Sequence, residues 1–174
     1  AEALRMGMLR EAFLVGTPQV WTEDIKLQSS IRSGVGSIMI KARLNSGQVE
    51  QLVRQQASDG LSIRTANVLV EAQLVDRVTR QIVARSGTAQ VNIARAREVV
   101  QQLSLSVANP TLWSVSNPYL YDVVVRIEHN GNTLDTYHRS FGFKSFSVTT
   151  VDGLRKFTLN DSVIRISAVD YVED

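Results

Sequence analysis

Apolar and polar residues alternate along most of the chain, with the two-residue period that is typical of β-strands. In the first such segment, Trp21, Ile25 and Leu27 are predicted to share one face. Four further segments show the same alternation: residues 37–44, 67–75, 101–108 and 121–129. Each segment therefore predicts a strand with one apolar face.

Two additional segments read as return arms of hairpins. Residues 76–84 follow the strand at 67–75, and residues 133–148 follow the strand at 121–129. The second pair is joined at Asn130-Gly131, a dipeptide that favours the type I′ turn because both central residues need a positive φ. Residues 45–60 have some helical spacing, but we interpret them mainly as strand and loop.

Seven or so strands without a long helical period predict an all-β fold, an immunoglobulin-like antiparallel β-sandwich. The chain has 174 residues, of which 44% are hydrophobic, enough for one packed domain. It has no cysteine, which excludes disulfides, thiol catalysis and thiolate metal sites. The sandwich is therefore expected to be of the cysteine-free kind.

The charge balance and hydropathy of the chain argue against nucleic-acid and membrane partners. Lysine and arginine total 19 against 17 acidic residues, and the arginines are scattered, which argues against a nucleic-acid partner. No apolar run approaches the roughly 18 to 20 residues of a membrane helix, so no membrane partner is expected. The first 16 residues carry charges within their apolar part and predict no signal peptide. The compartment stays open between cytoplasm and periplasm.

The titratable residues predict no active site. His129 and His138 flank the Asn-Gly turn without a third histidine or clustered carboxylates, so we expect exposed strand residues and no metal site. Glu23 and Asp24 are neighbours in a strand, point to opposite faces and cannot act together on one bond. There is also no glycine-rich phosphate loop and no nucleophile elbow. The residues therefore predict no cofactor.

The stretch from residue 109 to residue 123 collects two of the three prolines together with a tryptophan and two tyrosines. Prolines restrict the residues that precede them, and the chain must here cross from one sheet to the other. We predict a corner in which Trp113 plugs the open end of the sandwich and Tyr121 begins the next strand facing inward. A stacking platform for sugars or bases is the functional alternative.

The same stretch carries a longer ordered pattern. It consists of Asn109, Pro110, Leu112, Trp113, Ser114, Pro118, Leu120 and Tyr121, followed by Phe141, Gly142 and Phe143. This pattern resembles the immunoglobulin-like domain of glycoside hydrolase family two, which comprises β-galactosidases, β-glucuronidases and β-mannosidases. Lys144 stands where that family has arginine.

Both ends of the chain extend the resemblance. Residues 1–17 look like the end of the family's sugar-binding jelly-roll domain, and residues 149–174 look like a linker and the first strand of its (β/α)₈ barrel. The resemblance thus implies that residues 18–148 form the sandwich between them. The Arg5-Met6-Gly7 start and the Trp113-Ser114 corner are most similar to the β-galactosidase branch.

The ends also depart from the family pattern. Glu2 falls near the family's sugar-contacting aspartate and is the one candidate for a substrate contact on this chain. Asp170 and Val172 stand where the family has asparagine and histidine before the barrel, which argues against intact substrate contacts. By resemblance, the two catalytic glutamates lie inside the barrel, beyond Asp174.

The resemblance implies a non-catalytic structural domain that positions the sugar-binding and barrel domains of an enzyme acting on terminal β-glycosides. Its expected partners are the neighbouring domains of the same polypeptide, and a homo-oligomer is a further expectation. The alternative is a free-standing carbohydrate-binding module with an exposed aromatic row, for which Trp21, Tyr119 and Tyr137 are the candidates. An adhesion or receptor sandwich is a third hypothesis. The sugar, the linkage and the oligomeric state stay open.

Overall fold

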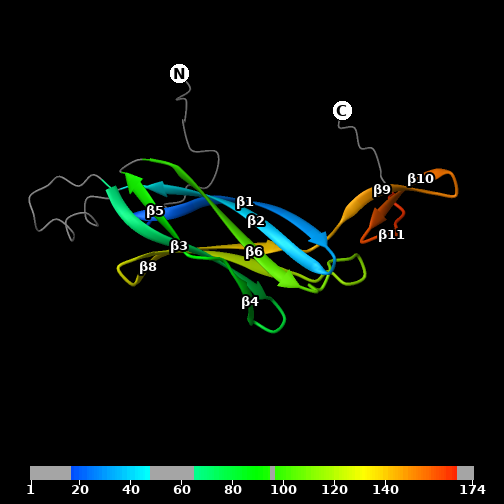
Figure 1. The fold of residues 1–174 in the computed structure, drawn as a ribbon, viewed down its shortest axis with the longest axis horizontal. Coiled ribbons are helices and arrows are strands. Elements are labelled where there is room, and N and C mark those ends of the chain that lie inside the picture. Colours follow the sequence, from blue (N-terminus) through cyan, green and yellow to red (C-terminus); the bar gives the residue numbers. More distant parts are fainter. Residues whose placement is uncertain (1–16, 48–64, 95–96, 168–174) are drawn as a thin grey trace, which may run out of the picture.

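A computed structural model describes residues 17–47, 65–94 and 97–167, and within these ranges the regular elements are all strands. The strands of the first sheet are β1 (Val20–Arg32), β2 (Val35–Ser46) and β6 (Val99–Ala108). They lie in the order β1-β2-β6, and neighbouring strands are antiparallel (Figure 1). The β1–β2 connection is a tight turn, whereas β6 enters the sheet from far along the chain.

The second sheet is built around a long central strand. Its members are β3 (Thr65–Asp76), β4 (Ile82–Arg85), β5 (Ala89–Ala94), β7 (Tyr121–His129) and β8 (Asn132–Phe141). Strand β3 pairs with β7 on one side and with both β4 and β5 on the other. The predicted hairpin through residues 76–84 is confirmed as the β3–β4 pair.

A third, smaller sheet projects from one end of the sandwich (Figure 1). It contains β9 (Phe146–Val151), β10 (Leu154–Leu159) and β11 (Ser162–Val163) in the order β11-β10-β9. The return strand predicted for residues 133–148 therefore ends at Phe141, and residues 146–148 belong to β9. The predicted domain limit at residue 148 falls within this strand.

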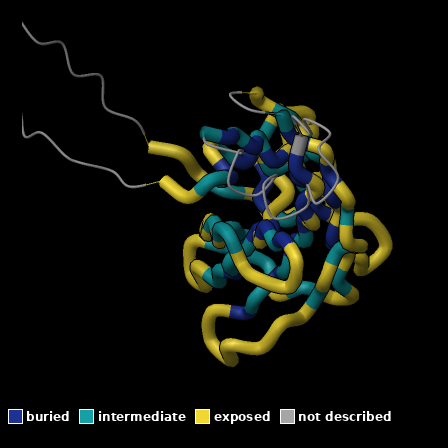
Figure 2. The backbone as a smooth tube through the Cα atoms, turned by 90° about the vertical axis from the view of Figure 1, so that its left-hand side faces the viewer, coloured by how far each residue is buried: buried dark blue, intermediate teal, exposed yellow. Residues whose placement is uncertain are grey.

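The core lies between the first two sheets. Alternate residues of β3 are fully buried, as the sequence pattern predicts, and they form one core cluster with buried residues of β7, in the same sheet, and of β2, in the other sheet. The five from β3 are Ala66, Val68, Val70, Ala72 and Leu74. Figure 2 shows the buried stretches gathered inside the body of the sandwich and the exposed ones at the turns. The all-β sandwich predicted from the alternation is thus confirmed.

The prediction that Trp21 shares a face with Ile25 is wrong. The register of β1 against β2 shifts between Thr22 and Asp24, so Glu23 is an extra residue in a β-bulge. A bulge reverses the alternation beyond it, because one residue has no partner across the ladder. Thr22 and Ile25 consequently face the core, whereas Trp21 lies opposite Asn45 on the outer face.

The tight turns follow the expected chemistry. Asn130 and Gly131 have φ values of 50° and 78°, the positive pair that a type I′ turn needs.

Within the described ranges, no helical segment has the length and apolar character of a bilayer crossing. Most of the predicted strand-and-loop region, from residue 48 onward, lies outside the described residues.

Candidate functional site: the aromatic corner

The corner between β6 and β7 is where the chain crosses from the first sheet to the second. Tyr121 opens β7 with its side chain 3% exposed, as predicted. Its hydroxyl accepts a hydrogen bond of 2.9 Å from the backbone N–H of Thr111, ten residues upstream. Immunoglobulin-like domains use such a tyrosine corner at the start of the equivalent strand. The bond fixes the loop over the end of the core.

The ring that plugs this end of the sandwich is Phe143, not Trp113 as predicted. Phe143 has no solvent exposure, and it meets Tyr121 and Phe141 edge-to-face with ring centroids 5.6 and 4.9 Å apart. Trp113 is only half-buried and lies outside this cluster. Trp113 has the larger ring, but the strand crossing at Leu112 and Phe143 decides which ring points inward.

Backbone contacts explain why the two parts of the sequence pattern occur together. Leu112 and Phe143 form a parallel bridge, and the Trp113 N–H donates to the Phe143 carbonyl at 2.8 Å. A Cβ on Gly142 would lie 2.9 Å from the Trp113 Cβ, closer than real side chains approach. Glycine is therefore required between Phe141 and Phe143 so that the corner can touch this segment.

The start of the corner is equally close-packed. Asn109 has a φ of 46°, a conformation that asparagine tolerates better than most residues. Its N–H donates to the Gly34 carbonyl at 2.6 Å, which ties the corner to the β1–β2 turn. Pro110 and Phe143 leave no room for a side chain on Gly36, where a Cβ would lie 2.8 and 2.6 Å from their rings.

The second proline region contains a local turn. The Ser114 N–H donates to the Asn117 carbonyl at 2.8 Å, and the Ser114 hydroxyl accepts from the Asn117 N–H at 3.0 Å. Pro118 is exposed and Leu120 is half-buried. Of the residues in the pattern, Pro118 thus serves the local turn, whereas Tyr121 and Phe143 contribute to the core.

An acidic clamp that the sequence did not predict holds the corner to the second sheet. Tyr119 donates its hydroxyl hydrogen to Asp76 Oδ2 at 2.5 Å, while Asp76 Oδ1 accepts from the N–H groups of Val78 and Thr79. These bonds hold the pKa of Asp76 below its usual value, the bond from Tyr119 having the largest effect. The same bond raises the pKa of Tyr119 to about 12. The Asp76-Arg-Val-Thr sequence is typical of a side-chain-capped turn and could have indicated the carboxylate's role.

Asn160 connects the corner to the small third sheet. Its side-chain NH₂ donates to the Trp113 carbonyl at 2.9 Å, and its side-chain oxygen accepts from the Ser145 N–H at 3.0 Å. Its own N–H donates to the Ser145 carbonyl at 2.8 Å. The residue has a φ of 50°, so few other side chains could replace it without strain. One residue thus joins three segments that are far apart in the sequence.

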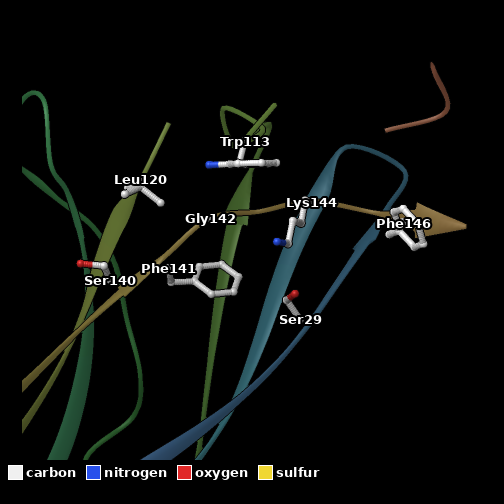
Figure 3. A pocket seen from close by; sticks show the side chains of 8 residues that line it. All are labelled: Ser29, Trp113, Leu120, Ser140, Phe141, Gly142, Lys144 and Phe146. Carbon is white, nitrogen blue, oxygen red and sulfur yellow. The ribbon is translucent and has the colours of Figure 1, made fainter. Parts of the chain in front are cut away.

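An open hollow of about 380 Å³ lies beside the corner. Its lining residues are Ser29, Trp113, Leu120, Ser140, Phe141, Gly142, Lys144 and Phe146 (Figure 3). The Lys144 ammonium lies 4.9 Å from the centre of a Trp113 ring, within cation–π range. None of the lining residues is a carboxylate, so this hollow cannot supply the acid pair of glycoside hydrolysis.

The other candidates do not converge on one site. Tyr119 and Tyr137 pack against the core, whereas Trp21 lies on the outer face of β1, so the three do not form an exposed row. His129 is 4% exposed and its Nδ1 lies 2.7 Å from the Asn67 carbonyl, so the expectation that it is exposed is wrong. His138 is exposed as predicted.

The remaining acidic candidates do not form a pair of carboxylates. Glu23 lies 3.7 Å from Arg43, and Asp24 lies 3.0 Å from Arg139, so each carboxylate has its own arginine. Glu2, Asp170 and Val172 lie outside the described residues. Any contact that they make with a substrate stays a prediction.

Curated relatives carry glycosidase names. Over 103 residues the chain is 31% identical to a β-galactosidase of Bacteroides ovatus, covering 59% of this chain and 12% of that protein. Over 164 residues it is 24% identical to a β-galactosidase of Leuconostoc mesenteroides, covering 94% of this chain and 14% of that protein. The chain thus spans about one-seventh or less of the length of these relatives.

Solved structures share the fold. A glycoside hydrolase family 2 β-glucuronidase matches 85% of this chain and 15% of its own, with a TM-score of 0.68 and 17% identity. A family 2 member from Bacteroides cellulosilyticus matches 85% of this chain and 17% of its own, with a TM-score of 0.66 and 22% identity. The sequence model of the glycosyl hydrolases family 2 matches residues 23–144, a span that takes in the corner and the Phe-Gly-Phe segment. The chain therefore belongs to glycosyl hydrolase family 2.

Proposed function

We propose that the chain acts as a non-catalytic sandwich domain that seats neighbouring domains of a family 2 glycosidase against one another. The side chains of Tyr121, Tyr119 and Asn160 bind other segments of the fold at the corner, and its hollow has no carboxylate pair, which fits a mechanical role better than a catalytic one. The relatives named β-galactosidase suggest that the whole enzyme hydrolyses terminal β-glycosides.

The apolar face of the third sheet is the observation that carries this proposal. Phe146 and Phe157 are 56% and 44% exposed, and their rings stack with centroids 5.6 Å apart. Val148 lies directly opposite Phe157 in the ladder and is 45% exposed. A small sheet is stable when an apolar face is covered, and no second layer covers this face among the described residues. Such a surface favours a docking role toward an adjacent domain.

The connection of this sheet to the sandwich supports the same role. Asn160 binds the Trp113 carbonyl and the Ser145 backbone, so the β9–β10 hairpin is tied directly to the aromatic corner. A domain docked on the hairpin would therefore be held in a defined position relative to the sandwich core. On the family resemblance, the (β/α)₈ barrel is the domain that we propose docks there.

A first experiment asks whether the chain itself has activity. We expect the purified chain to release no product from aryl β-galactosides or aryl β-glucuronides, because no described pocket contains the two carboxylates of a glycosidase. Hydrolysis that tracks the folded chain through gel filtration would contradict the proposal.

A second experiment tests the docking face in a polypeptide that also includes the barrel. Phe157→Ser should lower the melting temperature of the barrel and reduce kcat/KM, since it removes apolar contact area. Val100→Ser is a matched control, because Val100 is 54% exposed on a different sheet. Equal effects of the two variants, or none from Phe157→Ser, would contradict the docking role.

The alternative function, a carbohydrate-binding module, is tested by titration of the chain with neutral galactosides. The arrangement of Trp21, Tyr119 and Tyr137 does not favour this alternative, because the three do not form an exposed row.

A further inference from the structure

The outer face of the β1-β2-β6 sheet carries an ordered set of polar side chains. Three cross-strand rows lie side by side: Lys26–Lys41–Gln102, Gln28–Met39–Ser104 and Ser30–Ser37–Ser106. Apart from Met39, each of these side chains is polar or charged, and none is acidic. Met39 stands at the centre of this face and is 47% exposed.

The face is hollowed around its centre. Met39 lines three adjoining hollows of about 600, 360 and 170 Å³. The largest extends toward Arg32 and Arg85, and the smallest lies between Lys26 and Lys41. No aspartate or glutamate lines any of the three. The two larger hollows lie in the size range of small-molecule sites, about 300 to 1,000 Å³.

The two lysines have an unfavourable arrangement on their own. Lys26 lies directly opposite Lys41 in the ladder, and neither forms an ion pair with a described residue. Like charges directly across a ladder destabilise the sheet. Of the two arginines that line the largest hollow, Arg85 is paired with Glu71 at 2.9 Å, whereas Arg32 forms no ion pair with a described residue. An anionic group held between the lysines would convert the repulsion into attraction.

We propose that this face binds an anionic oligosaccharide, a chain of sugars that carry carboxylate or sulfate groups. The lysines would bind the anionic groups, and the serine hydroxyls and glutamine amides would exchange hydrogen bonds with the sugar hydroxyls. Neutral sugars are commonly bound by aromatic stacking, which the three rows lack, so the charge is the feature that selects the ligand. A second copy of the same face is excluded as the occupant by its like charge. This proposal does not depend on the proposed role of the chain in positioning neighbouring domains.

Binding is tested by calorimetric titration of this chain with a short oligogalacturonate, a sulfated heparin oligosaccharide and a neutral galacto-oligosaccharide. We expect one of the anionic probes to bind, more weakly as salt increases, and the neutral probe not to bind. Lys26→Glu/Lys41→Glu should weaken binding about tenfold or more, since it replaces attraction by repulsion. Lys26→Gln/Lys41→Gln replaces this variant if the charge reversal prevents folding.

Two matched variants separate a sugar site from general attraction. Arg155→Glu/Lys156→Glu makes the same charge change on β10 and should leave binding unchanged. Ser37→Val/Ser104→Val keeps the charge and should weaken sugar binding about threefold through lost hydrogen bonds. The proposal is overturned if neither anionic probe binds at low salt, or if the β10 variant loses as much affinity. It is also overturned if polyglutamate binds as well as the sugars and the serine variant has no effect, which would indicate an acidic protein partner.

Discussion

The Tyr121 hydroxyl accepts a hydrogen bond from the Thr111 backbone N–H at 2.9 Å, across the loop that joins the two sheets. Tyr121→Phe keeps the buried ring and removes this bond. We expect the free energy of unfolding to fall by about 0.5 to 1.5 kcal/mol, the usual net value of one hydrogen bond. Urea unfolding monitored by circular dichroism measures the change. Tyr137→Phe is the control, because the Tyr137 hydroxyl has no hydrogen bond within the described residues.

The plug of the sandwich provides a second prediction. Phe143→Ala should cost about 3 to 5 kcal/mol, because it leaves a cavity where a fully buried ring contacts two others. Trp113→Ala should cost less, about 1 to 2 kcal/mol, because Trp113 is half-buried. Thermal unfolding of the two variants ranks them. The reverse ranking would show that Trp113, and not Phe143, closes the core.

The Asp76–Tyr119 clamp makes stability depend on pH at both extremes. Folding lowers the pKa of Asp76 below 3.8, so its contribution is complete above that pH and is lost as the pH falls through the folded-state value. Folding raises the pKa of Tyr119 from 10.0 to about 12, so the Tyr119 contribution is lost as the pH rises through this interval. The difference in the free energy of unfolding between the wild type and Asp76→Asn should therefore become smaller as the pH falls below 3.8. Asp152→Asn is the control, since its side chain is 87% exposed.

Asn160 should control how firmly the third sheet is attached. Asn160→Asp retains an acceptor for the Ser145 N–H but loses the donor to the Trp113 carbonyl. We expect amide exchange in β9 and β10 to become about fivefold to tenfold faster, as for the loss of about 1 kcal/mol of local stability. Exchange in β3 and β7 should not change. Uniformly faster exchange in all strands would show that Asn160 supports the whole fold instead.

The sequence alone determined most strands of the two large sheets, the Asn130-Gly131 turn and the family. Alternation predicted the buried faces of β3 and β7 because a half-buried strand needs an apolar residue at every second position. The Asn130-Gly131 turn followed from backbone sterics, and the corner pattern resembled one family over a long, ordered span. These properties are local or are written in the order of residues along the chain.

Only the tertiary structure decided which side chains meet. The bulge at Glu23 turned Trp21 outward, and the crossing of Leu112 beside Phe143 made Phe143 the plug. The Asp76–Tyr119 bond joins residues 43 positions apart, and the Asn160–Trp113 bond joins residues 47 apart. A one-residue change of register reverses every following side chain. Contacts across the sandwich therefore depend on how the strands pair, which alternation along a single strand does not specify.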